Sequence, residues 1–452
     1  MEKNLDIAID PFFSTEELNQ LAIEAGFVQR SSKLNGSIFL DLIVFHSSNL
    51  KDQSLNDLSG IVKEEYLIEI TKQSLHERFN ASALIFLKDT LEEMLQKQLD
   101  CSRLSLDNLK PFNRILLKDS TCFQIDESLT EYYPGSGGSG SSASVRIQFE
   151  YDILSGKIND LSVNAFNEQD AKDSVATIEL TEKGDLIIRD LAYMSFEVLE
   201  YISNNMRYFL CRANPNAYLY EFKAGEYVKI DFTEVTKYLQ KHGIDVLEKE
   251  VYLVRQKKRL KVRLILHLLP SNEIAKRLRK ARKNNLSKGG DGNLSKEYIA
   301  RASLNLFITN ANQSLIPTTN VWKLYRLRWQ IELIFKTWKS ICDLEKVKKV
   351  KKHRLECYIY SKLIIIVLGW QILWKTACQL FDKEGKALSF FKASKTLLGR
   401  KIRELRQIFF LKNESVKAFM MKFYDLSRTN HLLEKRKKEP TSLELLLGCL
   451  IN

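Results

Sequence analysis

Hydrophobic and polar positions alternate with a helical period through residues 1 to about 105. The stretch STEELNQLAIEAGF begins with Ser14, a residue type favoured at helix N-caps, and Glu17 follows three residues later, as in a capping box. The later stretch SLHERFNASALIFLKDTLEEML contains two helical patterns joined at residues 80–82. This pair fits either a helix-turn-helix or a plain helical hairpin. The pattern predicts a helical N-terminal region over residues 1–105.

From about residue 112 the pattern changes to short runs typical of strands. RILLKDSTCFQI, SVRIQFEYDI, INDLSVNAF and GDLIIRD are rich in β-branched and aromatic residues and are separated by turn residues. After the helical stretch LAYMSFEVLEYISNN, similar runs return in YFLCRANP, YVKIDF and VYLVRQKKRLKVRLILHLL. Strands mixed with helices predict an α/β fold in which helices flank a mixed sheet.

The stretch PGSGGSGSS, residues 134–142, lies between two predicted antiparallel strands. Its composition is that of a flexible linker, whereas its position favours a mobile glycine-rich loop at one edge of a sheet. It lacks the Gly-Lys-Ser/Thr ending of a phosphate-binding P-loop.

After about residue 341 the chain is basic and then helical to its end. The most apolar stretch, LIIIVLGWQILW from Leu363 to Trp374, contains Gln371 and is bounded by Lys362 and Lys375. It is shorter than the roughly 20 residues that a membrane-spanning helix needs. We therefore predict a buried core helix and no membrane association.

The stretch YRLRWQIELIFKTWKS, Tyr325 to Ser340, has the period of one helix. At about 100° per residue, Tyr325, Arg328, Glu332 and Lys339 fall within about 40° of one another. Such a line is either a surface salt-bridge ladder or a metal-binding carboxylate whose basic neighbours hold phosphates. A separate apolar stripe should be buried, formed by Leu324, Leu327, Ile331, Ile334, Phe335 and Trp338.

Composition narrows these alternatives. The chain has 452 residues, enough for two to four domains, and its net charge of +13 favours a polyanionic partner. Its seven cysteines include no Cys-x-x-Cys pair, which argues for reduced cytosolic thiols and against a zinc ribbon. Acids stand near the N-terminus where a secretory signal needs an apolar run, so a cytoplasmic protein is expected.

Three carboxylates have suitable positions for metal chemistry. Asp119 and Asp190 lie in predicted strands, and Glu332 lies on the later helix, so all three can converge at one edge of a mixed sheet. Such a trio suits two divalent ions acting on a phosphodiester, and hard oxygen ligands select Mg²⁺ or Mn²⁺. Spacing alone does not decide, because the chain has 56 acidic residues.

The spacing Tyr, two residues, Arg, three residues, Glu, six residues, Lys across Tyr325–Lys339 resembles the signature of bacterial insertion-sequence transposases of the DDE class, in the family named after insertion sequence four. The contexts of the first two acids, Asp119-Ser120-Thr121 and Asp190-Leu191-Ala192-Tyr193, also resemble that family, as does the glycine-rich stretch between them. The resemblance runs from about residue 112 to 370.

This resemblance implies an RNase H-like catalytic core over residues 106–345, with a β-rich insertion over 206–290. The N-terminal region 1–105 would bind DNA ends, and residues 346–452 would form a C-terminal helical domain.

The resemblance also implies roles for single residues. Asp119, Asp190 and Glu332 would be the catalytic residues and the ligands of two Mg²⁺ or Mn²⁺ ions. Arg328 and Lys339 would grip phosphates, and the hydroxyl of Tyr325 would donate to another phosphate oxygen. Trp329 would stack on a base or fill the gap left by a flipped base, or else it packs against another domain.

The implied function is a DNA transposase that binds the terminal inverted repeats of its element, cuts them and joins the 3′-ends to target DNA. The basic runs 276–288 and 346–354 either follow DNA backbone or are solvated helix faces. A homodimer on DNA is expected, and the segment 355–452 is either its interface or a self-contained helical subdomain. The protein would be cytoplasmic and associated with the nucleoid. Two rivals are a nuclease of the same fold and a DNA-binding protein without catalysis.

Overall fold

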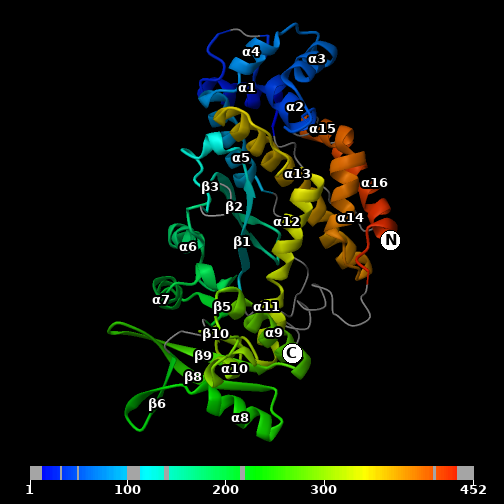
Figure 1. Cartoon of the computed structure of the whole chain (residues 1–452). Coiled ribbons are helices and arrows are strands. Elements are labelled where there is room, and N and C mark those ends of the chain that lie inside the picture. Colours follow the sequence, from blue (N-terminus) through cyan, green and yellow to red (C-terminus); the bar gives the residue numbers. More distant parts are fainter. Residues whose placement is uncertain are drawn as a thin grey trace. The chain divides into compact units, whose positions relative to one another are not determined.

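The computed structural model describes residues 13–30, 33–47, 50–98, 112–136, 142–213, 219–410 and 414–434. The chain forms two compact units (Figure 1). The first comprises Met1–Leu106, Ser120–Glu168 and Gln330–Thr441, and the second comprises Asp107–Asp119, Gln169–Trp329 and Ser442–Asn452. Strand β1 (Ile115–Gln124) contributes to both units, because the division between them falls after Asp119.

The N-terminal part of the first unit is helical, as its apolar period predicts. The capping box is confirmed: Ser14 Oγ accepts from the Glu17 amide over 3.1 Å, and the Glu17 carboxylate accepts from the Ser14 amide over 2.6 Å. Residues 78–80 join the two helical patterns seen in the sequence. The helices are α1 (Thr15–Glu24), α2 (Gly36–Phe45), α3 (Leu55–Tyr66), α4 (Lys72–Glu77) and α5 (Ala81–Gln96).

Helix α13 (Lys352–Glu384) lies at the centre of the first unit. It packs against α2 and α5 from the N-terminal segment and against α16 near the C-terminus (Figure 1). Every residue from Leu363 to Trp374 is buried, so the prediction of a core helix is confirmed. The remaining helical segments are α14 (Phe390–Lys395), the π-helical turn Thr396–Arg400, α15 (Ile402–Phe410) and α16 (Glu414–Asn430).

The burial of α13 corrects two expectations. Its apolar stretch is not a surface for dimerisation, because the chain's own helices already cover it. The helix is also longer than its apolar core suggests. Among the described residues it is the one helix whose length and composition would allow it to cross a membrane, yet 83% of its apolar window is buried inside the protein.

Strands of the first unit attach its helices to a sheet. Strand β2 (Ser144–Asp152) pairs antiparallel with β3 (Ile158–Ala165) and lies next to β1. The ring of Phe149 on β2 lies 4.9 Å from Trp338 and 5.9 Å from Trp370, so one aromatic cluster joins the sheet to α12 (Trp329–Ile341) and α13. Trp370 Nε1 also donates to the carbonyl of Gly156 over 2.7 Å.

The glycine-rich stretch 134–142 connects β1 to β2. Its ends are paired, since the Gly135 amide donates to the Ser142 carbonyl over 2.8 Å and Pro134 bridges to Ala143. Residues 137–141 lie outside the described residues, so the alternatives of a flexible linker and a mobile loop both stay predictions.

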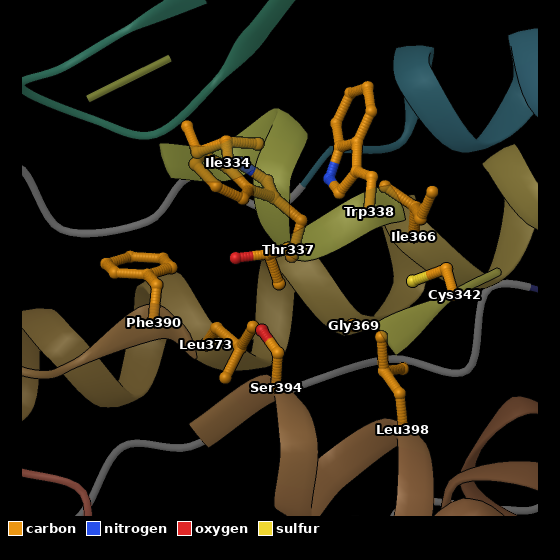
Figure 2. Close-up of a pocket in the computed structure, with 11 residues that line it drawn as sticks. Ile334, Thr337, Trp338, Cys342, Ile366, Gly369, Leu373, Phe390, Ser394 and Leu398 are labelled. Carbon is orange, nitrogen blue, oxygen red and sulfur yellow. The ribbon is translucent and has the colours of Figure 1, made fainter. Parts of the chain in front are cut away.

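Figure 2 shows where α12, α13 and α14 meet in the first unit. Ile334, Trp338 and Phe390 line a small gap together with Thr337 and Ser394. Its volume of about 20 Å³ accommodates about one water molecule, so this gap is a packing defect and no ligand site.

The second unit is built on a mixed sheet, as predicted. Residues 115–118 of β1 pair in parallel with β4, and β4 pairs in parallel with β5. Beyond β5 the pairing is antiparallel, in the spatial order β10, β9, β8, β6 and β7. The β-rich stretch therefore extends this sheet past β10. The strands are β4 (Leu186–Arg189), β5 (Tyr208–Arg212), β6 (Leu219–Lys223), β7 (Glu226–Lys229), β8 (Val246–Arg255), β9 (Lys258–Leu268) and β10 (Leu304–Thr309).

Helices of the second unit pack on this sheet around one apolar core. Phe209, Val251 and Leu264 from the strands meet Leu199 of α7 and Leu239 of α8 in that core. Short 3₁₀ turns occupy Ile178–Leu180, Leu191–Tyr193 and Thr318–Asn320 here, and Glu127–Leu129 in the first unit. The helices are α6 (Asp170–Thr177), α7 (Phe196–Asn204), α8 (Phe232–His242), α9 (Ser271–Ser287), α10 (Lys296–Ala302) and α11 (Val321–Arg326).

The stretch 325–340 is not one helix, which corrects the sequence prediction. Helix α11 ends at Arg326 and α12 (Trp329–Ile341) begins at Trp329. Between them, the amides of Leu327 and Arg328 bond to carbonyls three residues back instead of four, which makes the turn tighter than an α-helix. The predicted apolar stripe is nevertheless confirmed, because all six of its side chains are buried.

The tight turn breaks the predicted polar line. Tyr325 is buried on α11, with 7% of its surface exposed, and Arg328 lies in the turn itself. Glu332 and Lys339 remain seven residues apart on α12. A single helical projection therefore no longer relates the first two residues to the last two.

Candidate functional site

Asp119 and Asp190 stand at matching positions on two neighbouring parallel strands. The last registered pair between β1 and β4 is Lys118 with Arg189. Asp119 is the next residue of β1, and Asp190 directly follows the end of β4. Parallel strands lie about 4.8 Å apart, and their carboxyl ends meet at the same edge of the sheet. The backbone therefore holds the two carboxylates next to each other.

Two buried cations support the ends of these strands. Successive side chains of a strand point to opposite faces, so Lys118 and Arg189 face away from the two aspartates. Both are fully buried. Lys118 Nζ lies 2.6 Å from Asp173 Oδ2 and 2.8 Å from Thr177 Oγ1, and Arg189 Nη1 lies 2.7 Å from Ser174 Oγ. All three partners belong to α6.

This support was not predicted from the sequence. The one sign of it there is a basic residue directly before each candidate aspartate, within strands that are otherwise apolar. Burying a cation costs desolvation, which the ion pair of Lys118 with Asp173 and the hydrogen bond of Arg189 to Ser174 partly offset. These contacts anchor both strands to α6 next to the two carboxylates.

Arg328 contacts the first aspartate. Its Nη1 donates to Asp119 Oδ2 over 2.6 Å, and the two side chains are 17% and 20% exposed. The tight turn between α11 and α12 places the guanidinium there. The arginine predicted to hold a phosphate thus holds a candidate catalytic carboxylate in this structure.

Tyr325 contacts the second aspartate. Its hydroxyl donates to Asp190 Oδ1 over 3.3 Å, and its ring packs 5.1 Å from Phe307 on β10. Burial and the negative charge of Asp190 raise the pKa of Tyr325. The phenol therefore stays protonated and acts as a hydrogen-bond donor to the carboxylate.

Glu332, Lys339 and Trp329 lie along α12. Glu332 and Lys339 belong to the first unit and are partly exposed. Lys339 Nζ donates to the Cys122 carbonyl over 2.9 Å and lies 3.3 Å from the carboxylate of Glu345. Trp329 is 57% exposed, which agrees with its predicted place away from the apolar stripe.

The structure brings some of the predicted residues together. Asp119, Asp190, Tyr325 and Arg328 form one cluster in the second unit, whereas Glu332 belongs to the first unit. Among the described residues, no group of three or more His, Cys, Asp and Glu side chains is placed to hold a metal ion. The predicted three-acid metal site therefore stays a prediction.

Comparison with known proteins identifies the class to which this fold and cluster belong. The family described as transposase DDE domain matches residues 110–368, more than half of the chain and the part that carries Asp119, Asp190 and Glu332. The chain belongs to this family and is a DDE transposase.

The chain is similar to individual insertion-sequence transposases along nearly the whole length of both proteins. The chain is 31% identical to the transposase for insertion sequence element IS231F of Bacillus thuringiensis subsp. israelensis, over 95% of this chain and 90% of that protein. It is 28% identical to the transposase for IS1151 of Clostridium perfringens, over 88% of this chain and 86% of that protein. The protein is thus a transposase of the kind encoded by bacterial insertion sequences.

Family membership has general implications for the fold and chemistry of this site. A DDE domain implies an RNase H-like core, the use of divalent metal and binding of DNA. The side-by-side carboxylates of Asp119 and Asp190 fit this requirement, since they offer hard oxygen ligands and would repel each other without a cation between them. Arg328 already supplies one positive charge at this place.

Proposed function

We propose that this transposase binds the terminal inverted repeats of its own insertion sequence, cleaves each end and joins the freed 3′-ends to target DNA. The observation that supports this most is the register of β1 and β4, which sets Asp119 beside Asp190. The residues at the Tyr and Arg positions of the signature, Tyr325 and Arg328, then contact these two acids. Four residues predicted from sequence to share a site thus meet in one unit.

In this proposal Asp119, Asp190 and Glu332 are the catalytic residues and would hold two Mg²⁺ or Mn²⁺ ions. Bound divalent ions would activate the attacking oxygen and stabilise the leaving oxygen. Tyr325 keeps Asp190 oriented through its hydroxyl, and Arg328 keeps Asp119 oriented until DNA phosphate arrives. Lys339 and the exposed Trp329 remain candidates for contacts to a phosphate and to a base.

The proposed chemistry comprises two substitutions at phosphorus. In cleavage, a water oxygen forms a bond to phosphorus, and the bond from phosphorus to the 3′-oxygen breaks, which leaves a 3′-hydroxyl and a 5′-phosphate. In joining, that 3′-hydroxyl forms a bond to a target phosphorus, and the target's own 3′-oxygen leaves. Cleavage consumes one water molecule and one phosphodiester, and the water's proton passes to the leaving 3′-oxygen. Joining exchanges one phosphodiester for another, and neither step needs an oxidant.

The domain assignment belongs to the same proposal. Residues 106–345 form the catalytic core, 206–290 its β-rich insertion, 1–105 the domain that binds DNA ends, and 346–452 the C-terminal helical domain. Because the β-rich strands continue the sheet from β10, this insertion would extend the catalytic sheet and not stand apart from it. Two DNA ends must meet for joining, so we propose a homodimer on DNA, in the cytoplasm at the nucleoid.

Of the two basic runs, the one on α9 fits DNA backbone better. Arg277 docks α9 by donating to Asn305 Oδ1 over 2.6 Å, and this leaves Arg279, Lys280, Arg282 and Lys283 exposed. In the run 346–354, by contrast, several cations contact the chain itself. Lys348 donates to the Lys51 carbonyl over 3.2 Å. We therefore place the phosphate-following surface on α9.

The test uses the full chain, a duplex carrying the inverted repeats that flank its coding region, and a target plasmid. We expect Mg²⁺-dependent release of 3′-hydroxyl ends at the repeat boundary and covalent joining of those ends to the plasmid. A duplex with scrambled repeats serves as the control. Cleavage without joining would favour the nuclease alternative, and repeat binding without either reaction would favour a DNA-binding protein that lacks catalysis.

A further inference from the structure

Four aromatic side chains share one face of the sheet formed by β6, β7, β8 and β9. Cross-strand pairs join Tyr220 to Tyr252 and Phe222 to Tyr227, which puts these residues on a common side. The rings of Phe222 and Tyr227 lie 4.9 Å apart, and those of Tyr227 and Tyr252 lie 5.2 Å apart. Phe222 keeps 53% of its surface exposed. We call these four residues the aromatic face.

Cations border the aromatic face. The guanidinium of Arg259 lies 4.3 Å from the centre of the Tyr227 ring, a cation–π contact. Lys261 stands opposite Tyr252 in the β8–β9 register, where it also pairs with Glu250, and Lys229 stands opposite Tyr220.

The β8–β9 hairpin is strongly basic as a whole. Residues 246–268 contain seven Lys and Arg against two Glu, so the hairpin carries a clear excess of positive charge. On the opposite face of the sheet, Arg255 and Lys258 pair with Glu197 and Glu200 of α7, each over 2.6 Å. These pairs hold the hairpin onto its own unit and leave Arg259 directed to the aromatic face.

The candidate acids make no use of the aromatic face, which lies on other strands than β1 and β4. Exposed aromatic rings cost free energy in water, and a cluster of them on a folded sheet marks a surface that binds something. A protein partner would favour an apolar face with few charges, whereas the surplus of cations here complements a polyanion.

We propose that the aromatic face binds unpaired DNA bases by stacking, while Arg259 and Lys261 hold the adjoining phosphates. Duplex DNA hides the faces of its bases, so a sheet of rings can stack only on a strand that has been unpaired. This inference rests on the proposed function, since cleavage and joining at DNA ends are what would supply a freed strand. The proposal places the freed strand on residues 220–261, a stretch of the sequence that contains none of the three candidate acids.

The experiment measures fluorescence anisotropy of a labelled, mixed-sequence DNA strand of about 20 nucleotides with the full chain. Phe222→Ala and Tyr227→Ala should weaken binding, and loss of one stacked base predicts roughly 5- to 150-fold at most. Phe222→Trp should retain affinity because it keeps a stacking surface. The matched control is Tyr298→Ala, since Tyr298 on α10 is similarly exposed at 47%.

A second pair of strands separates stacking from charge. A strand of the same length with abasic sites keeps its phosphates, so it should bind more weakly than the normal strand and be insensitive to Phe222→Ala. Arg259→Gln should weaken both strands and flatten their salt dependence, whereas Lys241→Gln on α8 should change neither. Thermal melting of each variant checks that the fold is kept.

Several outcomes would overturn the proposal. These are equal binding by wild type and Phe222→Ala, tighter binding of the matching RNA strand, or a Phe222→Ala variant that loses self-association in sedimentation while its DNA affinity is unchanged. The last outcome would make the face a protein interface. Cleavage of the inverted-repeat duplex by wild type is measured in parallel. If wild type does not cleave this duplex, the proposed function is refuted, and this result is separate from the strand-binding result.

Discussion

Arg328 Nη1 donates to Asp119 Oδ2 over 2.6 Å and thereby fastens the turn after α11 to the middle of β1. The pair is mostly shielded from water, with 17% and 20% of the two side chains exposed. A divalent ion at Asp119 would need the same carboxylate oxygens. The arginine and the metal should therefore compete for Asp119 until a DNA phosphate draws the guanidinium away.

This competition gives the first prediction. Arg328→Gln should bind Mn²⁺ more tightly than wild type in the absence of DNA, by roughly three- to tenfold, because a partly shielded ion pair contributes about 1 kcal/mol. Calorimetric titration of the full chain with Mn²⁺ measures this. Lys241→Gln, which removes a cation from α8, is the control and should leave the affinity unchanged. An affinity equal to or weaker than wild type in Arg328→Gln would show that the pair does not oppose metal binding.

The second prediction concerns the three acids. Asp119→Ala, Asp190→Ala and Glu332→Ala should each abolish cleavage of a repeat-containing duplex while end binding is largely kept, because the change removes ligands for metal and not DNA contacts. Glu234→Ala, an exposed acid at the first turn of α8, should cleave normally. Gel assays of cleavage and of binding are run on the same preparations. Robust Mg²⁺-dependent cleavage by any one of the three variants would remove that residue from the site.

The third prediction concerns α9. Lys280→Ala and Lys283→Ala should each reduce the slope of log affinity against log salt by about one unit, because each removes one phosphate contact. The loss should be similar on repeat-containing and random duplex, since phosphate contacts carry no base information. Lys237→Ala on α8 is the control. Unchanged slopes in both α9 variants would mean that this helix face is merely solvated.

The fourth prediction concerns pH and the buried Lys362. Burial lowers the pKa of Lys362 to about 8, although its Nζ donates to the Ser47 carbonyl over 3.0 Å. The unfolded chain keeps this proton up to about pH 10.4, so between pH 8 and 10 the unfolded state binds more protons. The free energy of unfolding should therefore rise with pH over that window, by an amount on the order of 2–3 kcal/mol from this group.

Lys362→Met isolates that contribution. The variant should be more stable relative to wild type at pH 7.5 than at pH 9.5, as measured by urea unfolding at both values. Burial raises the pKa of Cys342 to about 12, so this thiol ionises first in the unfolded state and lowers stability as pH rises. Wild type and variant share Cys342, so the difference between them largely removes its contribution. If the stability difference between variant and wild type does not change with pH, Lys362 has the same charge in the folded and the unfolded state over this window.

The fifth prediction compares two glycines. Gly156 has φ +72°, and a Cβ there would lie 2.1 Å from a ring carbon of Trp374, whereas Gly225 has φ +89° and no heavy atom within 4 Å of such a Cβ. Gly156→Ala should therefore destabilise the fold by about 2–5 kcal/mol, and Gly225→Ala by only about 1–2 kcal/mol. Urea midpoints of both variants test this. Equal losses would mean that Trp374 moves aside freely.

Much of the site's scaffold was predictable because its signals are local. The strand patterns around Asp119 and Asp190 are short and apolar, and both strands form as predicted. The helical period also identified the buried stripe of α11 and α12 correctly. The roles of the three acids rest on family resemblance and remain predictions.

What the sequence could not predict depends on tertiary contacts. Nothing in the period of residues 325–340 marks the tight turn at Arg328, because the apolar positions continue through it. The contacts of Lys118 and Arg189 with α6 join residues about 15 to 60 positions apart, and such pairing is set by the fold. The burial of Leu363–Trp374 by helices from the other end of the chain is equally non-local.

The position of α13 also affects how the protein is made. Lys362 reaches Ser47, which lies 315 residues earlier in the chain. Helices α2 and α5 pack against each other's neighbours through Phe27, but the faces that they turn to α13 stay uncovered until α13 is present. At about 5–20 residues per second, the N-terminal helices emerge from a ribosome tens of seconds before their partner. During that interval the apolar faces that will pack on α13 are exposed to aggregation and to proteases. Molecules cut short before α13 would remain in that state, so the yield of competent transposase should depend on how often translation reaches the last quarter of the message.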